Sequence, residues 1–84
     1  MNALIEVWQK TAKEVYDAET KYLNCFNKPE KERTYTYKYL AQKQIELLEE
    51  SRPDKNKNVL DQMNELQKEC YEYLKKVATT GKIL

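Results

Sequence analysis

Residues 2–26 read NALIEVWQKTAKEVYDAETKYLNCF, and the apolar side chains in this stretch have the spacing of one face of an α-helix. They recur every three or four positions, at Leu4, Ile5, Trp8, Ala12, Val15, Ala18, Tyr22, Cys25 and Phe26. A half-buried β-strand would instead alternate with a period of two. The stretch therefore predicts a long amphipathic helix over residues 2–26.

The rest of the chain contains few residues that form turns. Gly81 is the only glycine, and Pro29 and Pro53 are the only prolines. This scarcity favours a few long helices over the repeated turns of an all-β domain. Proline suits the first turn of a helix and disfavours helical geometry in the residue before it. We therefore predict a second helix over about residues 29–51 and a third over about residues 55–79.

These helices predict an all-α fold class, a small antiparallel three-helix bundle with up-down-up topology. The expected organisation is a single helical domain, residues 1–84, with residues 80–84 as a short C-terminal tail. The third helix has apolar residues in alternating steps of four and three, which is the spacing of a helix packed along a neighbour: Val59, Met63, Leu66, Cys70, Tyr73 and Val77. Packing inside the bundle is the favoured interpretation, and pairing with a second chain remains an alternative.

Residues 32–40 read ERTYTYKYL and alternate like a strand. The sequence has no second alternating run to pair with it, and a lone strand leaves its backbone polar groups unsatisfied. The helical interpretation is therefore preferred. At about 100° per residue, Tyr37 then faces the core, while Tyr35 and Tyr39 lie one turn apart on the outside.

The outward tyrosines and nearby lysines form the candidate partner-binding site. Fifteen lysine and arginine residues nearly balance fourteen aspartate and glutamate residues, so any role for charge requires local clustering. The predicted partner-binding residues are Tyr35, Tyr39, Lys31, Lys38 and Lys43. The predicted topology also brings a wider set of basic residues to one end of the bundle, namely Lys28, Lys31, Arg33, Lys38, Lys75, Lys76 and Lys82.

The residues available for catalysis are few. The chain has no histidine, and its single serine, Ser51, has no base to activate it. The acidic residues Glu46, Glu49 and Glu50 lack the histidines that accompany carboxylates in metal-binding bundles. We therefore expect no enzymatic activity, no metal and no cofactor. Cys25 and Cys70 are expected at different levels of the bundle, as small buried hydrophobic residues and not as a disulfide.

Hydropathy and the N-terminal sequence bear on the cellular location. No run of eighteen apolar residues is present, so no membrane span is expected. The N-terminus lacks the basic and apolar regions of a signal peptide, so the expected location is the cytoplasm of a cell or of a host cell.

The favoured functional hypothesis is a non-enzymatic helical protein-binding module that regulates or inhibits a partner protein. Its small size and few catalytic residues also suggest a phage origin. A first alternative is a nucleic-acid-binding regulator that uses lysines for phosphates and tyrosine rings for stacking. A second alternative is a self-assembling structural subunit, such as a homodimer formed through the third helix.

Overall fold

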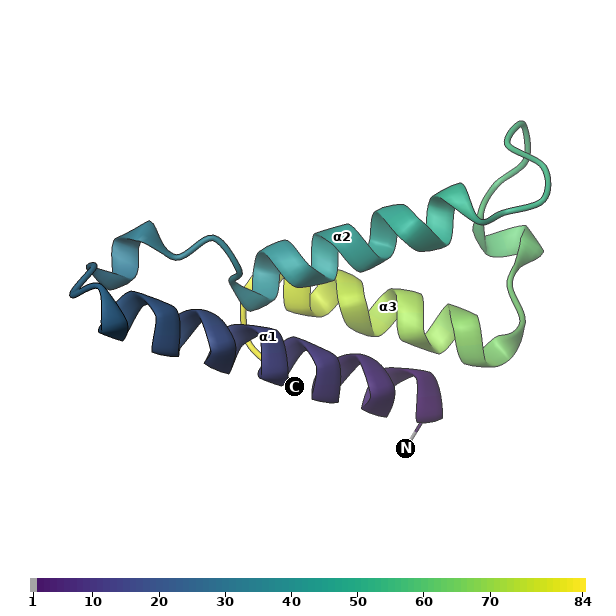
Figure 1. The fold of residues 1–84 in the computed structure, drawn as a ribbon. Coiled ribbons are helices and arrows are strands. Elements are labelled where there is room, and N and C mark those ends of the chain that lie inside the picture. The colour runs from purple at the N-terminus through teal and green to yellow at the C-terminus, as the bar shows by residue number, and fades with distance from the viewer. Residues whose placement is uncertain (1) are drawn as a thin grey trace.

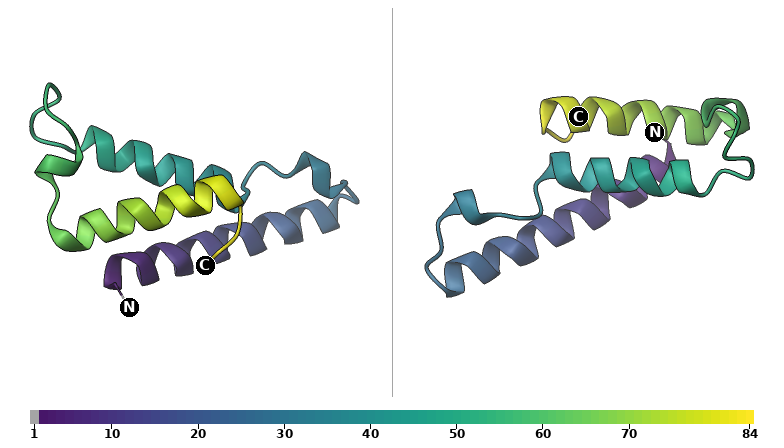
Figure 2. Two further views of the ribbon diagram at one scale, coloured as in Figure 1. Left: turned by 180° about the vertical axis from the view of Figure 1, so that it is seen from behind. Right: turned by 90° about the horizontal axis from the view of Figure 1, so that it is seen from above.

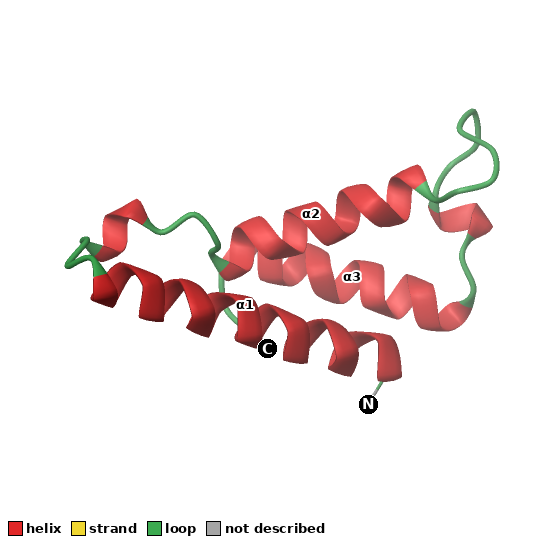
Figure 3. Ribbon diagram, in the orientation of Figure 1, coloured by secondary structure: helices red, strands yellow, loops and turns green. Residues whose placement is uncertain are grey.

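The computed structural model describes residues 2–84, so Met1 of the expected single domain lies outside the described residues. It contains three α-helices, α1 (Ala3–Cys25), α2 (Tyr37–Glu50) and α3 (Glu65–Thr80) (Figure 1). Two single-turn 3-10 helices, η1 (Glu30–Glu32) and η2 (Leu60–Gln62), lie in the connections. Residues 2–84 contain helices and loops but no strand (Figure 3). The predicted all-α three-helix fold is confirmed.

The three helices run up-down-up, but they do not cover one another along their full lengths. α2 and α3 lie side by side and antiparallel, and α1 lies beside them only along its first half (Figures 1 and 2). The second half of α1 extends past both, so the molecule is elongated, with extents of 46 × 28 × 19 Å. We call residues 17–25 the α1 extension.

The hydrophobic core lies where all three helices meet. Its buried members are Trp8, Ala12, Ala41, Cys70, Leu74 and Val77. Around it pack the partly buried side chains of Ile5, Tyr37, Leu40, Ile45, Leu48, Tyr73, Ala78 and Ile83. The contribution of α1 therefore ends at Ala12, about halfway along the helix.

Polar contacts join the start of α1 to α3. The Asn2 side chain accepts a hydrogen bond from the Leu4 amide at 2.9 Å, which satisfies one of the free donors of the first turn. Its Nδ2 donates to the Leu66 carbonyl at 2.7 Å and to the Glu69 carboxylate at 3.2 Å. Asn2 is itself buried, so it fixes the position of α1 along α3.

The C-terminal tail follows a glycine stop signal and folds back. Gly81 has a φ of 73°, in the left-handed region that favours glycine, and its amide donates to the Val77 carbonyl. Ile83 then packs against the core. The Leu84 amide donates a hydrogen bond to the Tyr73 hydroxyl at 3.3 Å.

The predicted start of the second helix, residue 29, is wrong, because α2 begins at Tyr37. α1 ends at Cys25, and Asn27 has a positive φ of 51°. Pro29 is extended and η1 makes one turn. Arg33 and Thr36 are extended, with a bend between them at Thr34, and the Oγ1 of Thr36 caps the Tyr39 amide at 3.1 Å. We call residues 26–36 the α1–α2 loop.

The predicted start of the third helix, near residue 55, is also wrong, because α3 begins at Glu65. Gln62 holds the preceding segment in a loop: its Oε1 accepts from the Asp54 amide, and its Nε2 donates to the Asp54 carbonyl. Asn64 and Gln67 then form a reciprocal capping box that starts the helix. Val59 and Met63 therefore lie before the first residue of α3. The sequence had predicted both as members of the heptad pattern of this helix.

Candidate functional site

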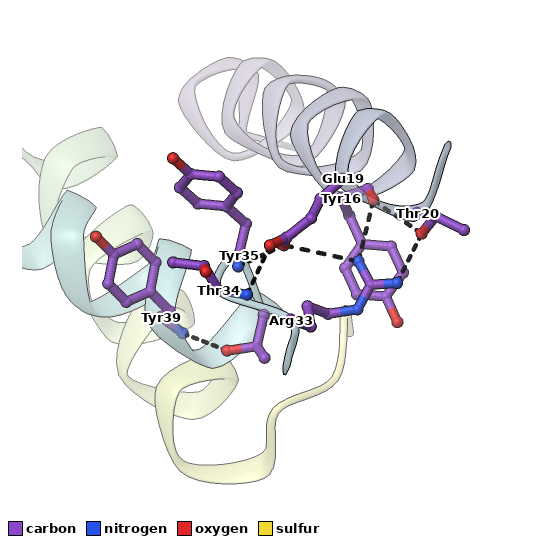
Figure 4. Close-up of polar contacts among 8 residues, drawn as sticks. Tyr16, Glu19, Thr20, Arg33, Thr34, Tyr35 and Tyr39 are labelled. Atoms are coloured by element: carbon purple, nitrogen blue, oxygen red, sulfur yellow. Dashed lines mark hydrogen bonds and ion pairs between the residues drawn. The ribbon is translucent and has the colours of Figure 1, made fainter. Parts of the chain in front are cut away.

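The α1–α2 loop is attached to the α1 extension through Glu19. The two oxygens of this carboxylate accept hydrogen bonds from the backbone amides of Thr34 and Tyr35, each at 2.6 Å (Figure 4). Arg33 lies on the same side, with its guanidinium 3.9 Å from the carboxylate. These contacts satisfy two backbone donors that a helix would have used internally, and they account for the extended loop.

Arg33 is the second anchor of the loop. Its guanidinium donates to the Tyr16 carbonyl at 3.1 Å and to the Thr20 hydroxyl at 2.7 Å. It also lies 3.8 Å from the centroid of the Tyr16 ring, and that ring stacks on Tyr37 at 4.6 Å. Only 8% of the Arg33 side chain is exposed. The loop is therefore held in one position by stacking and by charge-assisted hydrogen bonds.

The environment of Glu19 changes its acidity. Partial desolvation acts to raise the pKa of this carboxyl, but the Thr34 and Tyr35 amides and the Arg33 charge outweigh it and hold the pKa below the usual glutamate value. A carboxyl with a lowered pKa in the folded state stabilises the fold above its unfolded-state pKa. That contribution is lost as the pH falls through the folded-state pKa.

We predict that Glu19→Gln reduces the sensitivity of the fold to acid. The wild type should lose thermal stability between pH 6 and pH 3 by more than the variant, because the variant has no carboxylate to protonate at this site. Circular dichroism melting curves at both pH values measure the difference. Glu72→Gln, at an exposed position on α3, is the matched control and should keep the wild-type acid response. An equal loss in wild type and Glu19→Gln would contradict the prediction.

The two tyrosines predicted to lie outside do meet, although Tyr35 is not helical. Tyr35 lies in the extended end of the α1–α2 loop, and Tyr39 lies in the first turn of α2. Their ring centroids are 5.9 Å apart in an edge-on arrangement with an interplanar angle of 64°. Tyr35 is 42% exposed, and Tyr39 is half-buried. The Glu19 contact at the Tyr35 amide positions the first ring (Figure 4).

The predicted lysines are only partly gathered at this site. The Lys43 ammonium lies 5.5 Å from the Tyr39 ring centroid and 3.6 Å from the Glu46 carboxylate. Lys38 is exposed in the first turn of α2. Lys31 lies on η1, which is over the end of α1 and away from the start of α2 (Figure 1).

The wider set of basic residues is also less uniform than the sequence predicted. The Arg33 side chain is turned inward and does not contribute to an exposed basic surface. Two lysine ammonium groups lie over rings, that of Lys28 at 5.5 Å from Tyr22 and that of Lys75 at 4.5 Å from Tyr71.

An apolar hollow beside the tyrosine pair was not predicted from the sequence. It has a volume of about 540 Å³ and lies between the second half of α1 and the loop, lined by Val15, Ala18, Glu19, Tyr22, Thr34 and Tyr35. The apolar spacing of residues 2–26 predicts that Val15, Ala18 and Tyr22 lie on the inward face of the bundle. They line an open hollow instead, because α2 and α3 do not extend along this part of α1.

The cysteines differ from each other. Cys70 is buried in the core, and burial raises the pKa of its thiol. Cys25 is exposed at the end of α1, so its predicted burial is wrong. Both are free thiols, as expected for two residues at different levels.

Neither a metal cluster nor a transmembrane helix is found among residues 2–84. In this part of the chain, no three acidic or cysteine side chains are grouped as metal ligands. None of its helices has the length and apolarity that crossing a bilayer requires.

Comparisons with protein-family models, with curated proteins and with solved structures give no match.

Proposed function

We propose that this chain is a non-enzymatic protein-binding module that regulates or inhibits a partner protein by binding it through the tyrosine pair. The observation that carries the proposal is that the exposed ring of Tyr35, on a loop that Glu19 and Arg33 hold in place, lies against the half-buried ring of Tyr39 at the start of α2. Tyrosine is common among the residues that dominate protein interfaces, because it combines a large apolar face with a hydroxyl that tolerates water.

The rigidity of the loop supports this proposal energetically. Binding by a mobile segment loses affinity, because its backbone and side chains must be ordered when the complex forms. Here the backbone amides of Thr34 and Tyr35 already donate to the Glu19 carboxylate on α1. Lys38 is exposed in the same turn of α2 as Tyr39, which favours a partner with acidic groups near an apolar centre.

A nucleic-acid-binding role has less support. It would require several free cationic groups for phosphate contacts. Lys43 is paired with Glu46, Arg33 is directed toward α1, and the net charge of the chain is only +1.

The proposal predicts that Tyr35→Ala combined with Tyr39→Ala weakens binding of the partner. The tagged wild-type chain is used to capture proteins from a lysate of the cells that produce it, and the affinity of the captured protein is then measured. Loss of two central rings should weaken binding by about 2 kcal/mol or more, roughly thirtyfold.

Leu47→Ala, which removes an exposed apolar side chain elsewhere on α2, is the matched control and should bind normally. Nuclease treatment of the lysate separates the alternative function, because binding through nucleic acid would then disappear. Unchanged affinity in the folded double variant would refute a role for the tyrosine pair.

A further inference from the structure

α1 has a second apolar face that its own domain leaves largely uncovered. The side chains directed toward the rest of the molecule include Ile5, Ala12 and Leu23. About 100° around the helix axis lies another stripe, which runs along the whole helix. Its members are Leu4, Trp8, Thr11, Val15, Ala18, Tyr22 and Cys25. We call these seven residues the α1 seam.

The spacing of the α1 seam is that of a coiled coil. Its steps alternate between four and three residues over the length of the helix, and Thr11 is its only polar member. Trp8 is buried at the edge of the domain core, whereas Leu4 is 43% exposed and Tyr22 is 52% exposed. A seam of this kind is complete only when a second helix lies along it, and α2 and α3 do not reach the α1 extension (Figure 2).

We propose that the α1 seam is the docking surface for the α1 helix of a second copy of this chain, with the two helices antiparallel. The alignment that pairs the seams places Val15 of one copy level with Ala18 of the other. It then places Thr11 level with Tyr22 and Trp8 level with Cys25. This inference goes beyond the proposed function, because it concerns assembly of the chain with itself through α1.

Charge complementarity favours the antiparallel direction. Glu14 and Lys21 are exposed and flank the seam on the side away from the domain core. In the antiparallel alignment Glu14 faces Lys21 of the second copy, and the two-fold axis repeats this pair. In a parallel pair Glu14 would instead face Glu19, a like charge, and Lys21 would face Phe26.

The shape of the surface is self-complementary in the same alignment. A hollow of about 240 Å³ opens beside the first half of the seam, lined by Leu4, Val7, Trp8, Thr11, Gln44, Leu48 and Cys70. Phe26, which is 62% exposed just past the end of α1, is brought level with this hollow in the second copy. The two-fold axis repeats the contact, as required of an interface between identical surfaces.

The exposed area agrees with the size of such an interface. The molecule exposes 6109 Å², whereas a compact monomer of 10.1 kDa exposes about 5,300 Å². The excess of about 800 Å² goes with the elongated shape, and it is enough to supply the area that each partner buries in a standard protein–protein interface.

The first test is the mass of the purified chain by sedimentation equilibrium as its concentration rises. The mass should approach twice the 10.1 kDa of one chain, and Ala18→Glu should hold it near 10.1 kDa by weakening association at least about a hundredfold. Ala18 is exposed in the single chain, so this variant should keep its helical circular dichroism spectrum. Lys13→Gln makes the same change in net charge at an exposed position outside the seam, and it should associate like the wild type.

The second test uses charge exchange and identifies the direction of pairing. Glu14→Lys and Lys21→Glu should each weaken self-association about tenfold, and combining them in one chain should restore it. A mixture of the two single variants should form heterodimers. One variant then has lysine at both positions, 14 and 21, and the other has glutamate at both, so opposite charges face each other in both pairs.

A wild type that stays at 10.1 kDa up to about 1 mM would overturn the proposal, and so would a double exchange that fails to restore association. Neither result would affect the proposed function, which depends on Tyr35 and Tyr39 and is measured by partner binding.

Discussion

Replacing Leu74 with alanine is expected to lower the free energy of unfolding by about 3 to 4 kcal/mol, because Leu74 is completely buried where α3 meets the other helices. A single core in a domain of this size supplies only about 3 to 5 kcal/mol of stability. The variant should therefore be largely unfolded at room temperature. Urea denaturation followed by circular dichroism measures the change.

Leu66→Ala provides the matched control for that experiment. It makes the same substitution in the same helix, but Leu66 is 52% exposed, so the expected change is within about 0.5 kcal/mol. The Leu66 carbonyl that accepts from Asn2 is a backbone group and remains in the variant. A loss below about 1 kcal/mol for Leu74→Ala would mean that the core can close around the missing side chain.

Replacing Arg33 with alanine is expected to release the α1–α2 loop while the rest of the fold stays intact. The variant loses two hydrogen bonds from the guanidinium, its stacking on Tyr16 and its charge beside Glu19. Local opening should become easier by about 2 kcal/mol, so the Thr34 and Tyr35 amides should exchange with solvent roughly thirtyfold faster. Hydrogen exchange resolved by residue measures this effect.

Two controls limit the interpretation of faster exchange. The Leu74 amide should exchange at the wild-type rate, because the loop lies outside the core. Arg52→Ala removes the other arginine, which donates to the backbone carbonyls of Glu49 in α2 and Lys55 in the following loop, and it should leave the exchange of the Thr34 and Tyr35 amides unchanged. If Arg33→Ala also leaves these two amides unchanged, the Glu19 contacts alone hold the loop.

The helical fold was predictable because the apolar spacing in residues 2–26 depends only on neighbouring positions. The start of α2 at Tyr37 was not, because the competing contacts with Glu19 come from 15 and 16 residues earlier in the chain. No local pattern records such a contact. The start of α3 carried a readable signal, since Asn64 followed by Gln67 is the signature of a capping box.

The sequence predicted the tyrosine pair of the candidate site, but it did so by assuming a helical backbone that the structure does not have at Tyr35. Tyr35 and Tyr39 were expected to meet because they lie one helical turn apart, yet a bent backbone brings their rings together. The apolar residues of α1 were all assigned to one inward face. Their angular positions around the helix axis form two stripes instead of one. Leu4 and Ile5 are neighbours in the sequence but belong to different stripes, so the sequence already contains this division.

Two polar contacts near the start of α3 differ greatly in the length of chain that each must close. The Tyr71 hydroxyl donates to Glu49 across 22 positions, whereas Asn2 reaches Leu66 across 64. Closing the longer segment costs about 1 kcal/mol more in chain entropy, so the shorter contact forms roughly fivefold more often in an unfolded chain. We therefore expect α2 and α3 to meet before α1 docks onto them in most folding events.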